Sequence, residues 1–206
     1  MRLDDDLSVE ELVSLLEMDL GIDPGFLTRL ADEDDWSFVI KSHAFLEAAL
    51  SHLIAHALDA PALGTVLAYL DTANTRSGKL AFLRELDLLD DVSRRFVKSF
   101  SELRNSLVHD VSQVSFSFSE YLAGLDKQQT DNFAKSFSLF ATGPTFERNG
   151  KEVSTREFVL QSSKQSVWFC VMSLCAVIYI SKDNVRLRKM LNALQHQVGV
   201  PAMGGT

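Results

Sequence analysis

The sequence predicts an all-α protein, a bundle of helices with one small β-hairpin near residues 145–154. Only four of the 206 residues are proline, and leucine, alanine, serine and charged residues are abundant, a composition that favours helices. Several segments place apolar residues three and four positions apart, which is the period of a helix with one buried face. The Asn149-Gly150 pair inside 145–154 is typical of a tight hairpin turn.

Helix boundaries follow from capping residues and chain breakers. Ser8 is expected to cap a first helix that runs to about Asp19, and Asp35 to cap a long second helix. Gly21 and Pro24 separate these two helices. The expected helices after the first are 35–58, 61–70, 77–88, 92–110, 126–141, 155–181 and 184–197. Residues 111–118 alternate between apolar and polar, which predicts an extended segment.

Charge is distributed unevenly along the chain. The first 35 residues hold twelve acids and two bases, whereas the remaining residues hold 16 acids and 18 bases. We therefore expect an acidic N-terminal helical arm over 1–35, a helical domain over 36–198 and a flexible tail over 199–206. The arm is interpreted as a solvating or partner-binding segment, or as a segment that shields a basic cleft from nucleic acid.

Composition also carries expectations about location and cofactors. The start of the chain has no basic, apolar, small-residue leader, so we expect a cytoplasmic protein. The apolar stretch 167–180 is too short to span a bilayer, so no membrane contact is expected. Cys170 and Cys175 match no zinc or redox spacing and are expected to be buried thiols. His52 and His56 have the spacing of a metal pair but no third ligand nearby, so no metal or other cofactor is expected.

The most informative segment is 103–110, Leu-Arg-Asn-Ser-Leu-Val-His-Asp, near the end of an expected helix. Apolar residues four, three and four positions apart give this helix one buried face; they are Phe96, Phe100, Leu103 and Leu107. At about 100° per residue, Asn105 and His109 lie one turn apart on the opposite face, and Glu102 falls about 20° from His109. Arg104 lies about 140° from His109, so the two meet only if the arginine reaches round the helix or a second copy supplies it.

These residue types suit phosphodiester cleavage without a metal. A histidine takes or gives a proton near neutral pH, and an arginine binds the non-bridging phosphate oxygens. Asn105 then orients a partner or donates to phosphate, and an RNA substrate supplies its own 2′-hydroxyl as nucleophile. The structural alternative is a surface ion pair for Arg104 and a favourable helix C-terminal position for His109.

The run from Leu103 to Asp110 resembles the signature of the HEPN superfamily, in which an arginine and a polar neighbour precede a histidine. The segment 74–83 and the aromatic residues Phe116, Phe118 and Tyr121 resemble a narrower branch, the mannitol operon repressor-like proteins. The resemblance covers roughly residues 36–190, and the arginine-histidine run is its specific part.

The resemblance implies a HEPN-like helical bundle that forms a homodimer with both motifs facing a shared cleft. It implies a metal-independent endoribonuclease of toxin–antitoxin or phage-defence type, with His109 as general acid/base, Arg104 as phosphate contact and Asn105 as polar support. The alternative within the superfamily is a non-catalytic transcriptional regulator that acts through protein partners. A third reading is an antitoxin-like or immunity partner that is inactive alone.

Further residues are candidates for supporting roles. Glu47 stands in an apolar stripe one turn from His43, so its carboxylate needs a partner. That partner is either His43 or a base from a neighbouring helix, and in the functional interpretation Glu47 holds Lys79 or Arg104 at the cleft. Glu102 is a second supporting acid. The candidate RNA-binding residues belong to a basic cluster around the motif helix; they are Arg76, Arg94, Arg95 and Lys98.

Overall fold

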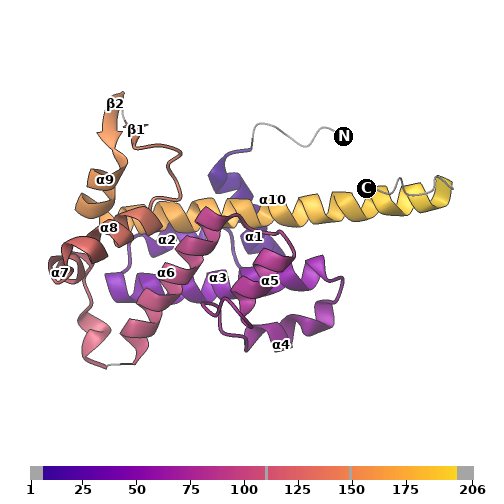
Figure 1. Cartoon of the computed structure of the whole chain (residues 1–206), viewed down its shortest axis with the longest axis horizontal. Coiled ribbons are helices and arrows are strands. Elements are labelled where there is room, and N and C mark those ends of the chain that lie inside the picture. The colour runs from indigo at the N-terminus through magenta and orange to yellow at the C-terminus, as the bar shows by residue number, and fades with distance from the viewer. Residues whose placement is uncertain (1–6, 110, 149, 199–206) are drawn as a thin grey trace.

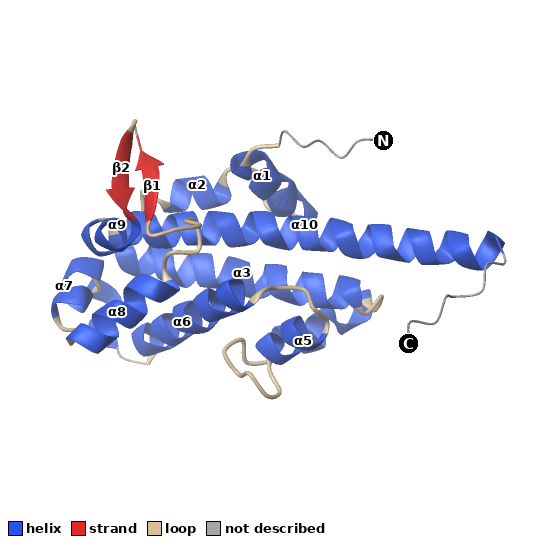
Figure 2. Ribbon diagram, turned by 45° about the horizontal axis from the view of Figure 1, so that its top comes forward, coloured by secondary structure: helices blue, strands red, loops and turns tan. Residues whose placement is uncertain are grey.

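The computed structural model describes residues 7–109, 111–148 and 150–198, and the expected tail 199–206 lies outside these ranges. Over these ranges the fold is all-α with one two-stranded sheet, as the sequence predicts. Two long helices, α3 (Asp35–Ala57) and α10 (Ser163–Val198), lie side by side and form the centre of the molecule (Figures 1 and 2). The shorter helices pack around this pair.

The N-terminal helices belong to the same core as the rest of the chain. Helix α1 (Val9–Asp19) begins at Ser8, whose hydroxyl accepts the N–H of Glu11 in a capping box. Its buried residues pack on α10, and α2 (Phe26–Leu30) packs on α3. The described part of the expected acidic arm is therefore built into the core, and position 35 is not a boundary between two cores.

A buried acid fixes the turn between α1 and α2. Glu17 is fully buried, and its carboxylate accepts the backbone N–H groups of Gly25 at 2.6 Å and Leu27 at 2.8 Å. Gly25 has a φ of +83°, a left-handed conformation that glycine adopts without strain. The carboxylate thus takes up N–H groups that the start of α2 leaves without helical partners.

Helix α3 is capped by Asp34, one residue earlier than expected, whose carboxylate accepts the N–H of Ser37 at 2.9 Å. After it come the 3₁₀ turn Pro61–Leu63, the short α4 (Gly64–Ala68) and α5 (Lys79–Glu85). The expected helix start at Ser77 is two residues early, because Asn74 accepts the N–H groups of Arg76 and Ser77 in a turn.

Helix α6 (Asp91–Val108) carries the candidate motif in its last turns. Asp90 caps it, and its apolar stripe is buried as predicted. The stripe packs on α8 (Lys127–Ser136) through ring contacts: Phe96 and Phe100 both meet Phe137 edge to face. The buried face of α6 therefore determines which way its polar residues point.

The expectation of an extended segment at 111–118 is wrong. Residues Val111–Ser115 form a 3₁₀ turn, and Phe118 begins α7 (Phe118–Ala123). The alternation arises because Phe116 and Phe118 both pack inward, with ring centroids 5.1 Å apart. The N–H of Phe118 donates to Asp35 rather than to a strand partner.

The hairpin forms where the sequence predicts it, with β1 (Thr145–Arg148) antiparallel to β2 (Lys151–Ser154), and Figure 2 shows it at one end of the molecule. Helix α9 (Thr155–Gln161) follows, and Ser162 leaves the helical conformation. The expected break between 181 and 184 is wrong, because α10 runs through these positions as one helix of 36 residues. Cys170 and Cys175 are free and buried in α10.

By length and composition, Asp35–Ala57 and Ser163–Leu191 are each apolar enough to cross a membrane. The apolar part of α10 is therefore longer than the expected 167–180. In the fold, 67% of the most apolar window of α3 and 56% of that of α10 are buried inside the protein.

Candidate functional site

A cavity of about 270 Å³ lies between α3, the loop after α4 and the last turns of α6. Its lining residues come from segments separated by up to 66 positions in the sequence. They are His43, Glu47, Asp71, Thr72, Ser101, Arg104, Asn105 and His109. The three candidate catalytic residues of the motif and the supporting Glu47 therefore meet in one cavity.

Arg104, Asn105 and His109 reach the cavity from a single chain. The Nη1 group of Arg104 donates to Oδ1 of Asn105 at 3.0 Å, which holds the arginine against its neighbour. His109 is the C-cap of α6, and both His109 and Arg104 line the cavity although an ideal helix places them about 140° apart. The long arginine reaches the same cavity without a second copy of the helix.

The guanidinium of Arg104 is only partly satisfied. Its Nε–H is buried and has no hydrogen-bond partner, and within the described residues no carboxylate forms an ion pair with it. A buried donor without an acceptor destabilises the protein unless water or a ligand supplies one. The cavity thus presents a cation with unused hydrogen-bonding capacity.

His43 lies beside Arg104 and is almost fully buried. Its Nε2 is 3.0 Å from Oγ of Ser101, and its Nδ1 is 3.6 Å from Oε2 of Glu47 without a hydrogen-bond partner. The pKa of His43 is lowered from near 6.5 to about 4, chiefly by burial; Glu47 opposes this shift, and the cations Arg104 and Lys79 add to it. His43 is therefore neutral at pH 7.

Glu47 and Lys79 form the other wall. The carboxylate of Glu47 accepts the hydroxyl of Thr72 at 2.7 Å and lies 3.7 Å from Nζ of Lys79. Lys79 is fully buried and also donates to the carbonyl oxygen of Leu70 at 2.8 Å. Burial lowers the pKa of Lys79, and Glu47 opposes this shift. The predicted need for a partner at Glu47 is thus met by Thr72 and Lys79, and the neutral His43 lies 3.6 Å away; Glu47 itself is half-buried rather than buried.

The loop that carries Asp71 and Thr72 is held by backbone contacts that leave no room for a side chain at Gly78. A Cβ at Gly78 would lie 2.0 Å from the carbonyl oxygen of Asp71. The adjacent Lys79 N–H donates to that same oxygen at 3.0 Å. The contacts of Gly78 and Lys79 with Asp71 therefore fix the loop, and its residues Asp71 and Thr72 line the cavity.

Glu102 is not part of this cavity, contrary to expectation. It is exposed, pairs with Lys98 at 3.7 Å and lines a separate pocket with Tyr121. The helical wheel places it near His109 in angle, but seven residues along the axis separate the two by about 10 Å. A helical wheel gives the angle of a residue around the helix axis but not its position along that axis.

The expected basic cluster is dispersed. Arg94 binds Asp91 and the carbonyl oxygen of Leu89 at the start of α6, about 15 Å along the axis from Arg104. Lys79 is buried, and Lys98 pairs with Glu102. Arg95 is half-buried on α6, and Arg76 is exposed in the turn before α5. None of the four candidate RNA-binding residues lines the cavity.

Sequence reasoning missed part of the site. The sequence indicates His43 only as a partner of Glu47 and assigns no role in the site to Ser101, Asp71 or Thr72. The available signal was a polar residue on the buried side of each of two helices, His43 on α3 and Ser101 on α6. Such residues need partners, and here they find each other.

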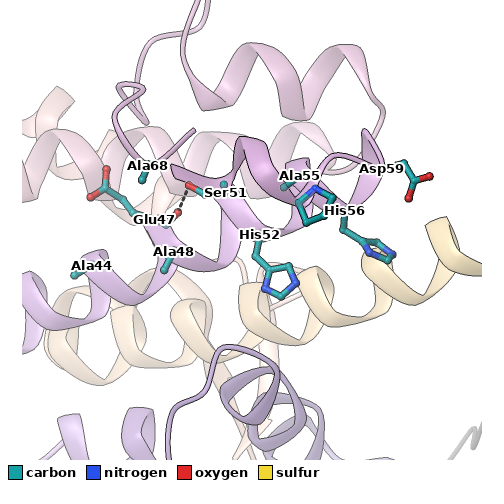
Figure 3. A pocket seen from close by; sticks show the side chains of 11 residues that line it. Ala44, Glu47, Ala48, Ser51, His52, Ala55, His56, Asp59 and Ala68 are labelled. Carbon is teal, nitrogen blue, oxygen red and sulfur yellow. Dashed lines mark hydrogen bonds between the residues drawn. The ribbon is translucent and has the colours of Figure 1, made fainter. Parts of the chain in front are cut away.

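A second, larger cavity of about 710 Å³ adjoins the first at Glu47. Figure 3 shows its floor along α3, with Ala44, Ala48 and Ala55 between polar residues, and Ser51 donating to the carbonyl oxygen of Glu47 at 2.8 Å. His52 and His56 lie at its far end, half-buried rather than on the surface, and burial lowers the pKa of each.

Within the described ranges, no group of three or more His, Cys, Asp or Glu side chains is arranged to hold a metal ion. No protein-family model, curated protein or solved structure matches the chain.

Proposed function

We propose that the cavity at Arg104, Asn105 and His109 is the centre of an endoribonuclease that needs no metal. The observation that carries the proposal is a partly buried guanidinium with a free Nε–H, in one cavity with a histidine and an amide. The resemblance of the motif to HEPN ribonucleases supports the same chemistry.

In the proposed reaction the 2′-oxygen of a ribose attacks the adjacent phosphorus, and the bond from phosphorus to the 5′-oxygen breaks. His109 takes the proton of the 2′-hydroxyl, and water protonates the leaving 5′-oxygen. Arg104 stabilises the negative charge that builds on the non-bridging oxygens. Asn105 holds the guanidinium in place through its 3.0 Å contact. The products are a 2′,3′-cyclic phosphate and a 5′-hydroxyl.

The test is cleavage of total cellular RNA and tRNA in EDTA, with analysis of the new ends. We expect His109→Ala and Arg104→Ala each to lower the rate by about 100-fold or more. Lys41→Ala is the matched control, because Lys41 is exposed on α3, pairs with Glu33 and lies outside the cavity. Wild-type rates in the His109→Ala variant would end the proposal.

A non-catalytic regulator that acts through protein contacts is the second candidate. It is favoured by exposed apolar residues on the last turns of α10, which extend beyond the rest of the molecule in Figure 1. These residues, called the α10 stripe below, are Leu187, Met190, Leu191 and Leu194. Intact RNA in every lane, with a partner captured through the α10 stripe, would favour this candidate. A homodimer is expected under either function.

A further inference from the structure

His43 and Arg104 line the same cavity, and each has a buried ring or guanidinium nitrogen without a hydrogen-bond partner. Nδ1 of His43 and Nε of Arg104 are buried atoms with no hydrogen-bond partner. Both residues line the 270 Å³ cavity. Because buried polar groups are almost always paired in native proteins, two such atoms at one cavity indicate a group that the cavity takes from outside.

The surroundings of His43 decide which of its nitrogens carries the proton. Nδ1 faces the carboxylate of Glu47 at 3.6 Å, and a negative charge at this distance favours a proton on Nδ1. Nε2 then accepts from the hydroxyl of Ser101 at 3.0 Å. In this tautomer Nδ1–H is a donor, as is Nε–H of Arg104, so a group that pairs with both must be an acceptor.

Arg104 is the charged group of the cavity lining that is left with an unused hydrogen-bond donor. Glu47 is matched by Lys79 and by the hydroxyl of Thr72. Oδ1 of Asp71 accepts the N–H groups of Ala73 at 2.8 Å and Asn74 at 3.3 Å. Arg104 has no such match among the described residues.

We infer that His43 is a second phosphate-binding residue of the cavity, whose Nδ1–H and the Nε–H of Arg104 donate to oxygens of one phosphate group. This rests on the proposed function, which places a phosphodiester there, and names a contact outside the Arg104-His109 motif. Ser101 is a positioning residue that orients the imidazole. The phosphate is then bound from α3 and α6 of one chain.

The chemistry of the imidazole fits a donor better than a base. Burial and the neighbouring cations keep His43 neutral, with a pKa of about 4. A base this weak abstracts a hydroxyl proton poorly at pH 7, whereas a neutral N–H donates to phosphate without adding charge. His109, exposed at the end of α6, keeps the proton-transfer role.

The test measures binding rather than turnover. Inorganic phosphate and then uridine 3′-monophosphate are titrated into the full chain, and the histidine ring nitrogens are followed by ¹⁵N NMR. We expect the wild-type Nδ1–H resonance of His43 to shift on saturation, with Nδ1 still protonated. The inference is overturned if this resonance does not move at saturating ligand, or if neither ligand binds. This part of the test uses the wild-type protein alone.

Two substitutions separate the two ring nitrogens. In His43→Asn the side-chain amide replaces the Nδ1 donor, and in His43→Gln it replaces Nε2. We expect His43→Gln to weaken phosphate binding by about 10- to 100-fold and His43→Asn to retain more of it. Lys41→Ala is the control. Equal affinity of wild type and a folded His43→Gln variant contradicts the inference.

The failures of the two proposals are distinguishable. Phosphate binding through His43 with intact RNA supports the inference and removes the ribonuclease. RNA cleavage by the wild type, with unchanged phosphate affinity in His43→Gln, supports the ribonuclease and contradicts the role of His43.

Discussion

His43 illustrates how the environment sets the character of a residue. The same side chain on the surface would be charged for part of the time near pH 6.5. Here it is buried between Ser101, Glu47 and two cations, so it stays neutral. Glu17 and Lys79 are also fully buried, but each keeps hydrogen bonds that satisfy its charged group. The difference lies in the partners that each residue finds.

The pKa of His43 predicts a pH dependence of stability. Between pH 6.5 and about 4 the unfolded state binds a proton at His43 and the folded state does not, so stability falls as the pH falls. From pH 7 to pH 5 this residue lowers the free energy of unfolding by about 2 kcal/mol. Urea titrations of wild type and His43→Gln at both pH values measure it. Equal losses of stability in the two proteins would contradict the prediction.

At the scale of elements, the predictable features are those encoded by neighbouring residues. Ser8 and the Asn149-Gly150 turn act within three or four positions, and the structure confirms the cap and the hairpin, although Asn149 itself lies outside the described residues. The uninterrupted course of α10 and the turns at 111–115 depend on packing against distant segments, so local pattern misled there.

The candidate site divides in the same way. Arg104, Asn105 and His109 share one helix and are visible in a short stretch of sequence. Glu47 and Lys79 were found because an acid in an apolar stripe needs a partner. The contact between His43 and Ser101 joins residues 58 positions apart, and nothing local indicates it.

The loop before α5 gives a prediction about two glycines. Gly78→Ala places a Cβ 2.0 Å from the carbonyl oxygen of Asp71, so the loop must move. We expect a loss of roughly 2 kcal/mol in stability and a weaker site, because Asp71 and Thr72 shift with the loop. Gly64→Ala is the matched control: it lies at the start of α4, nothing is within 4 Å of its Cβ, and it should be neutral or slightly stabilising. Thermal unfolding of both variants decides, and an unaffected Gly78→Ala would refute the account of the loop.

At the scale of the whole molecule, α10 performs two different tasks. Its first turns lie in the core beside α3, and its last turns extend past the other helices (Figures 1 and 2). Lys189 binds the carbonyl oxygen of His56 at 2.6 Å, close to the point where the helix leaves the body. The α10 stripe begins beside this contact, at Leu187, and continues past it. Exposed apolar residues that lie together in this way commonly mark a surface that binds a partner.

The α10 stripe predicts self-association. We expect the wild type to be a dimer in light-scattering measurements and the double variant Leu187→Glu, Leu191→Glu to be a monomer. Both residues are exposed, so the melting temperature of the monomer fold should change little. Met18→Glu, an equally exposed apolar position on α1, is the control. A double variant that remains dimeric would place the interface elsewhere.

The depth of α10 in the core also makes the protein inert toward thiol reagents. Burial raises the pKa of the Cys170 thiol to about 12 and raises that of Cys175 as well, so almost no thiolate is present. Five residues apart on a helix, the two sulfurs point in directions about 140° apart and do not meet in a disulfide. An alkylating reagent therefore modifies only molecules in which α10 has left the core. The rate of alkylation then measures how often the whole fold opens.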